Sequence, residues 1–138
     1  MTGEDDRAGG ITMELKQFDH IVLTTQDLDQ CLHFYRDVLG MRVREQDGRY
    51  ALLFGSQKIN IHRRKAEFLP AAAHPAYGSL DLCILAEGDI GTLQAEVEAK
   101  GWPIEEGPVE RHGACGVMDS LYLRDPDGNL VEISVPRK

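Results

Sequence analysis

The sequence lacks the features of several protein classes. Its 138 residues contain no apolar run close to the about 20 residues that span a bilayer, and no basic-then-apolar signal peptide at the N-terminus. Basic residues are also few, since 15 Lys and Arg stand against 23 Asp and Glu, for a net charge of −8. We therefore expect a cytoplasmic globular protein that binds neither nucleic acid nor membrane, because both partners require a basic surface.

Cysteine is scarce and irregularly spaced. Cys31, Cys83 and Cys115 are odd in number and far apart in the chain, which argues against a disulfide framework and against a zinc ribbon. We expect reduced thiols, with Cys83 as a small buried side chain.

An internal repeat determines the expected organisation. Residues 18–41 align without a gap on residues 79–102, so that His20 matches Asp81 at a shift of 61 residues. Each copy reads as a strand, a turn, an amphipathic helix and a glycine, followed by short strands between turn signals. The sequence predicts an α+β fold of two βαβββ modules, 14–63 and 79–136, in one domain of residues 14–136. Residues 64–78 form the linker, and the polar residues 1–13 are a disordered extension.

Helix boundaries and one loop can also be predicted. Asp27 and Asp89 are expected N-caps, and Gly40 and Gly101 end the helices. The glycine-rich segment 107–116 is predicted to be a mobile loop over the concave side of the sheets. Its residues Arg111, His112 and Cys115 either contact a substrate or are exposed to solvent without a role in binding.

Strand alternation predicts a polar face. Apolar residues such as Ile21, Leu23, Val131 and Ile133 share one side of their strands and should cover the helices, so the polar residues line the opposite, concave side. The closing strands of the two halves, "KINIH" and "LVEIS", align Asn60 with Glu132, just as the opening strands align His20 with Asp81. The predicted polar set is His20, Asn60, His62, Asp81, Tyr122, Arg124 and Glu132.

Two interpretations of this polar set are open. One imidazole, two carboxylates and an amide suit a divalent metal such as Fe²⁺, Mn²⁺, Ni²⁺ or Zn²⁺, and the lack of cysteine favours an open catalytic site. Alternatively, Arg124 neutralises Asp81 and Glu132 by salt bridges in a cup without metal.

The segments "FDHIVL" and "RDPDGNLVEIS" give the chain a family resemblance. Residues 15–136 resemble the vicinal oxygen chelate superfamily, which contains glyoxalases, ring-cleaving dioxygenases and bleomycin-resistance proteins, and further resemble the subgroup called glyoxalase domain-containing protein 5. The resemblance implies an open, incomplete barrel with metal ligands at His20, Asn60 (or His62), Asp81 and Glu132. The chain departs from glyoxalase I-like members at Asn60, where they have glutamate, and from many members at Asp81, where they have histidine.

The resemblance also implies a function. We expect a lyase or isomerase like lactoylglutathione lyase that acts on a small molecule with adjacent oxygens through a metal-stabilised enolate, with Asp81 or Glu132 as the catalytic carboxylate. Tyr122, Arg124, His62 and His112 are the expected substrate contacts. A homodimer is expected, with the site either within one chain or shared.

Two other functions are compatible with the same family. They are an Fe²⁺ ring-cleaving dioxygenase and a metal-free binding protein similar to bleomycin-resistance members. Bleomycin binders need an aromatic-lined groove, whereas this chain has a single tryptophan, Trp102, which favours the enzyme.

Overall fold

Each half of the described chain folds into a four-stranded sheet with the same strand order. The computed structural model describes residue 10 and residues 12–138, and most of the extension predicted over 1–13 lies outside them. The first half contains β1 (His20–Thr24), α1 (Leu28–Leu32), η1 (His33–Val38), β2 (Arg42–Gln46), β3 (Arg49–Phe54) and β4 (Gln57–His62). The second half contains β5 (Asp81–Leu85), α2 (Ile90–Ala99), β6 (Glu106–Gly113), β7 (Gly116–Arg124) and β8 (Leu130–Pro136).

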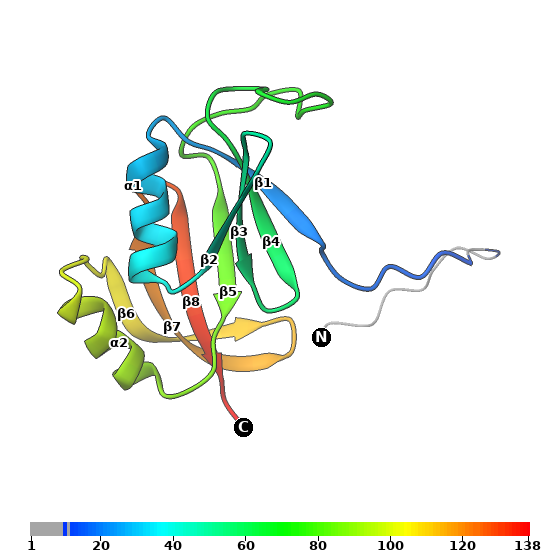
Figure 1. Cartoon of the computed structure of the whole chain (residues 1–138). Helices are drawn as coiled ribbons and strands as arrows, with labels where there is room; N and C mark the ends of the chain where they lie inside the picture. Colours follow the sequence, from blue (N-terminus) through cyan, green and yellow to red (C-terminus); the bar gives the residue numbers. More distant parts are fainter. Residues whose placement is uncertain (1–9, 11) are drawn as a thin grey trace.

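The sheet topology confirms the two βαβββ units and the α+β class. The strand orders are β1-β4-β3-β2 and β5-β8-β7-β6. In each half the first strand pairs in parallel with the last, and the other neighbours are antiparallel. Both helices lie on one side of the molecule (Figure 1). The strands β1 and β5 are therefore equivalent edges, each paired on one side within the described chain.

The helices begin where the capping residues predict. Asp27 accepts a 3.1 Å hydrogen bond from the backbone N–H of Gln30, and Asp89 accepts one of 3.1 Å from that of Thr92. The first helix differs from a simple α-helix, because α1 continues as the π-helical turn η1. This turn buries the consecutive residues Phe34 and Tyr35 completely.

The two halves share one hydrophobic core. Its fully or nearly buried residues come from both sheets and from the helices: Leu23, Cys31, Leu32, Phe34, Tyr35, Val38, Met41, Leu52, Ile59, Ile61, Val97, Leu123 and Val131. Trp102 packs on this cluster, with its ring centroid 4.9 Å from that of Phe34. Because side chains of both modules interdigitate, neither module has a separate core.

The glycine-rich segment 107–116 is not the mobile loop that we expected. It forms most of β6 and the tight turn into β7. A Cβ at Gly107 would clash with the carbonyl oxygen of Ser120, and one at Gly113 would press on the Met118 side chain. These glycines therefore allow the close approach of two paired strands, which a sequence pattern does not distinguish from a flexible loop.

Residues 63–80 connect the halves without helix or strand. The segment folds back on the first sheet: Glu67 is buried and bonded to Arg63, and Phe68 packs edge-on against His62 at 5.3 Å. In the part of the chain that the structure describes, no helix has the length and apolar character needed to cross a membrane.

Candidate functional site

His20 opens β1 and forms a pair with the preceding carboxylate. Its Nδ1 lies 2.8 Å from Oδ2 of Asp19, and this hydrogen bond lowers the pKa of Asp19. The His20 side chain is partly exposed. With Nδ1 engaged, Nε2 is the free ring nitrogen, which is the arrangement typical of histidines that bind metals.

His20 and Asp81 line the same cavity, a space of about 620 Å³ between the edges of β1 and β5. The repeat therefore does bring these two equivalent residues to one place. Apolar side chains including Ile21 and Ile84 form much of the wall. The Asp81 carboxylate makes no hydrogen bond or salt bridge with another described residue, so it is available to a ligand.

Glu132 lies on β8 at the centre of a small hydroxyl network. Ser134 donates a 3.1 Å hydrogen bond to its carboxylate and contacts Ser120 Oγ at 2.7 Å and Cys83 Sγ at 3.3 Å. Ser134 is fully buried, so the bond holds Glu132 in a defined orientation. Cys83 pairs with Glu132 across the two strands.

Cys83 is exposed, contrary to the buried position that we predicted. The reason is that β5 is an edge strand whose polar face is uncovered in the single chain. Partial burial, together with the Glu132 and Asp81 carboxylates, raises the pKa of the thiol, while the Ser134 hydrogen bond opposes that shift.

Asn60 and His62 lie on the equivalent face of the first sheet. Both line a second cavity, of about 240 Å³, between β2, β3, β4 and Phe68. Burial lowers the pKa of His62, with Glu67 opposing and Arg49 adding to the effect. Asn60 on β4 stands opposite Val22, which follows His20 by two residues on β1. In the same way, Glu132 on β8 stands opposite Cys83, which follows Asp81 by two residues on β5.

The expected metal ligands thus form two pairs, His20 with Asn60 and Asp81 with Glu132. Each pair consists of diagonal neighbours on adjacent strands. Across residues 10 and 12–138, however, one chain brings no three His, Cys, Asp or Glu side chains close enough to hold a metal. The donor types suit a divalent metal. His20 and Asp81 share one cavity of the single chain, but no third His, Cys, Asp or Glu of the described residues lies close enough to complete a metal site with them.

Among the described residues Arg124 forms no salt bridge with Asp81 or Glu132, although its hydrogen bond to Glu105, together with the nearby Asp81 charge, raises the pKa of the guanidinium. Its guanidinium pairs with Glu105 at 2.9 Å and donates to the carbonyl of Gly128. The salt bridges of the metal-free interpretation are therefore absent from the described chain. Tyr122 stands opposite Glu132 on β7, and its hydroxyl accepts a 2.9 Å hydrogen bond from Arg111.

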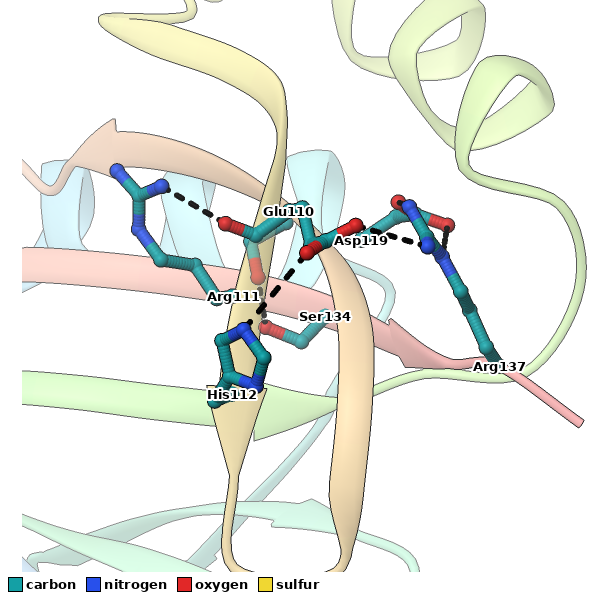
Figure 2. Close-up of polar contacts among 7 residues, drawn as sticks. Glu110, Arg111, His112, Asp119, Ser134 and Arg137 are labelled. Atoms are coloured by element: carbon teal, nitrogen blue, oxygen red, sulfur yellow. Dashed lines mark hydrogen bonds and ion pairs between the residues drawn. The ribbon is translucent and has the colours of Figure 1, made fainter.

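His112 lies apart from these residues. On β6 the side chains alternate, so Arg111 is beside Tyr122 whereas His112 is on the other face, 75% exposed and 3.7 Å from Glu110. Figure 2 shows Glu110 between His112 and Arg137, and Arg137 bound to Asp119. Cys115 is exposed in the turn after β6.

Three cations on the first sheet were missed from the sequence. Arg44, Arg49 and Lys58 line the cavity that contains Asn60 and His62. The alternation in "MRVREQ", with Arg42 and Arg44 flanking Val43, was the signal that could have found this basic face.

The fold agrees with the family resemblance. Residues 17–133 match the Glyoxalase/Bleomycin resistance protein/Dioxygenase superfamily. This match covers most of the chain, and the chain belongs to that superfamily.

Individual proteins are also similar to this chain in sequence and structure. Virulence protein STM3117 of Salmonella typhimurium is 47% identical over 125 residues, covering 90% of this chain and 87% of the relative. Its crystal structure has a TM-score of 0.87 at 45% identity, covering 91% of this chain and all (100%) of the other. Glyoxalase domain-containing protein RDO1 of Mycosarcoma maydis is 45% identical, and the match covers 88% of this chain and 69% of RDO1. The crystal structure of lactoylglutathione lyase from Agrobacterium tumefaciens has a TM-score of 0.69 at 26% identity, and the match covers 89% of this chain and 96% of the lyase chain.

Proposed function

We propose that this chain is a divalent-metal-dependent enzyme of the superfamily, in the subgroup named glyoxalase domain-containing protein 5. The reaction is a lyase or isomerase reaction on a small molecule with two adjacent oxygens. The observation that carries the proposal is the matched placement of two donor pairs, His20 with Asn60 and Asp81 with Glu132, at equivalent positions of the two sheets.

Local contacts support the same residues. Asp19 occupies Nδ1 of His20 and leaves Nε2 free, and Ser134 orients the Glu132 carboxylate. Carboxylate–histidine pairs and hydrogen-bonded carboxylates commonly support metal ligands. Asp81 has no competing ion pair among the described residues.

A second copy of the chain completes the site in this proposal. One described chain brings His20 and Asp81 to one cavity but does not gather three such ligands, so in this proposal the pair from the first sheet of one copy meets the pair from the second sheet of the other. A two-fold axis would form two identical sites in this way. The uncovered polar edge at β1 and β5, with Val22 and Leu85 exposed, is available for that contact.

The chain's residues have separate roles. A divalent cation, when bound, supplies Lewis-acid polarisation of the adjacent oxygens. Asp81 or Glu132 is the general base that accepts a proton next to a carbonyl, and Ser134 orients the Glu132 carboxylate by donating to one of its oxygens. Tyr122, kept in place by Arg111, lies beside Glu132 and contacts the substrate.

Metal-free binding of a small molecule is the second candidate. The cavity of about 620 Å³ at β1 and β5 supports it, because cavities of this size enclose whole ligands. If iron proves to be the metal, ring cleavage with O₂ replaces the isomerase reaction.

Metal analysis decides between these functions. The protein, purified without chelator or nickel resin, should contain near-stoichiometric transition metal, and Glu132→Gln should lose most of it. Glu98→Gln, on the exposed side of α2, should retain the metal of the parent. A parent without metal that still binds small molecules would transfer the assignment to the binding protein.

A further inference from the structure

Within residues 10 and 12–138 of this acidic protein, the arginines that form no salt bridge all lie on one face. Six of the described arginines form a salt bridge with a carboxylate, namely Arg36, Arg63, Arg64, Arg111, Arg124 and Arg137. The three other described arginines, Arg42, Arg44 and Arg49, form none. The chain has a net charge of −8, so carboxylates that could pair with these arginines are abundant. A group of arginines without carboxylate partners on one face therefore requires an explanation.

The strand register places these cations together. Arg44 stands opposite Ala51 on β3, and Ala51 stands opposite Asn60 on β4, so their side chains point to the same face. Gln46 with Arg49, and Lys58 with Leu53, occupy the neighbouring rows of that face. The cavity of about 240 Å³ is bounded by Arg44, Arg49, Lys58, Asn60 and His62, with one carboxylate, Asp47, in its lining.

One wall of this cavity fixes a guanidinium. The Arg49 Cζ lies 4.1 Å from the centroid of the Phe68 ring, and the same ring packs against His62. Stacking restricts the plane of the guanidinium and leaves its N–H groups to donate in that plane. Arg49 is thus preorganised for a planar or tetrahedral group of oxygens.

We infer that this pocket binds a small oxyanion, a carboxylate or phosphoryl group, through Arg44, Arg49 and Lys58. Guanidinium groups bind both kinds of oxygen acid in bidentate fashion, and an ammonium adds a point charge. Asn60 and Gln46 can add neutral N–H donors. At about 240 Å³ the pocket is smaller than the roughly 300–1,000 Å³ typical of whole-ligand sites, so it holds the anionic end of a larger molecule.

Lys58 connects the pocket to the cavity of the proposed active site. It lines both cavities, and it stands opposite His20 in the β1–β4 pair. A substrate anchored by its anionic end would extend past Lys58 toward His20 and Asp81. This assignment of the anion to the substrate rests on the proposed function, whereas anion binding by itself requires no metal.

Calorimetric titration of chelator-treated protein tests the pocket alone. In low-salt buffer, inorganic phosphate or succinate should bind saturably, and the uncharged succinamide should not. The tighter of the two anions identifies phosphoryl or carboxylate as the natural group. Arg44→Gln and Arg49→Gln should each weaken binding by about tenfold or more, since each removes a charge-assisted hydrogen bond. Arg44→Lys should retain more affinity than Arg44→Gln.

Arg42→Gln is the matched control, because Arg42 lies on the same strand and face but does not line the pocket. It should change affinity less than about twofold. The thermal unfolding midpoints of all variants should equal that of the parent. Three results would overturn the inference: no saturable anion binding, equal loss in Arg42→Gln and Arg49→Gln, or dissociation of a dimer by Arg44→Gln, which would make these cations contacts with a second copy. The first two results do not bear on the metal content, which tests the proposed function. Dissociation of a dimer would lower the metal content as well, because the proposed metal site needs two copies of the chain, whereas loss of anion binding alone would not.

Discussion

The hydroxyl of Tyr35 donates a 2.7 Å hydrogen bond to Oδ2 of Asp125, joining residues 90 positions apart in the sequence. Both side chains are buried. The same carboxylate accepts from the Asn129 amide, and its other oxygen accepts two backbone N–H groups in the turn before β8. Through this group the first helix of one module is attached to the strand that carries Glu132.

Tyr35→Phe removes that attachment. The Asp125 carboxylate would lose one donor inside the protein, so the free energy of unfolding should fall by about 1–3 kcal/mol. Denaturant unfolding followed by circular dichroism measures the change. Tyr77→Phe, in the linker, is the control and should have no effect, since the Tyr77 ring only faces Lys65. Equal stability of parent and Tyr35→Phe would contradict the role given to this bond.

The linker contributes stability that depends on pH. Burial alone would raise the pKa of Glu67, but hydrogen bonds from Arg63 outweigh it and the pKa is lowered from 4.5. A lowered folded-state pKa means that the stabilisation is present above the unfolded value and is lost as pH falls through the folded value.

Glu67→Gln should therefore destabilise the protein by about 1 kcal/mol or more at pH 7. The difference from the parent should shrink as the pH falls below the ordinary value of 4.5. Urea unfolding at a series of pH values provides the curve, with Glu98→Gln as the exposed control. A difference that is independent of pH would show that the Arg63 pair is not the cause.

The three thiols should react at different rates with iodoacetamide. Cys31 is completely buried, and burial raises its pKa to about 12, so it should be alkylated only when the protein unfolds. Cys83 and Cys115 are exposed in the single chain. Cys115 should react in the folded state, and Cys83, which lies beside Glu132 at the proposed shared site, should react only in molecules that are not paired with a second copy. Because the pKa of Cys83 is raised, Cys115 should be modified first. Mass spectrometry of timed samples gives the order, and early labelling of Cys31 would contradict the packing around α1.

Ser134→Ala should weaken metal binding without removing a ligand. Ser134 only orients Glu132, and loss of such a partner typically reduces metal affinity by about 10–100-fold. Titration with a competing chelator measures the affinity. Ser79→Ala, at an exposed position between the two halves and outside the lining of the cavity that contains His20 and Asp81, is the matched control. Unchanged affinity in Ser134→Ala would show that the hydroxyl network does not support the site.

Repetition and alternation explain why much of the fold could be predicted from the sequence. The internal repeat that aligns His20 with Asp81 predicted the two edge strands β1 and β5. Asp27 and Asp89 predicted where the two helices begin. Both predictions succeed because helix caps and strand periodicity are local properties of the sequence. The strand 106–113 was missed, since glycine favours flexible loops and close strand contact alike.

The candidate site was less accessible to sequence reasoning. The alternation of polar and apolar residues identified the polar faces of the strands. It could not predict that Arg124 pairs with Glu105, because this partner is 19 residues away on another segment and strand periodicity relates only residues of one strand. The contact between His20 and Glu132 that we propose would depend on how the sheets and chains associate, and association is decided by surfaces that form only after folding. The alternation of arginine with apolar residues around Arg44 indicates a basic strand face, so the cluster of Arg44 and Arg49 could have been predicted from the sequence.

Mixing two inactive variants tests the shared site most directly. His20→Ala and Glu132→Gln homodimers would each lack a ligand in both sites and should bind little metal. After the two proteins are mixed and allowed to exchange subunits, each heterodimer would have one site with both His20 and Glu132 intact. The metal content should then rise to about a quarter of that of the parent, if half of the dimers are mixed and have one of two sites complete. Metal content that stays at the level of the separate variants, in a mixture shown by mass spectrometry to contain heterodimers, would contradict a site formed between two chains.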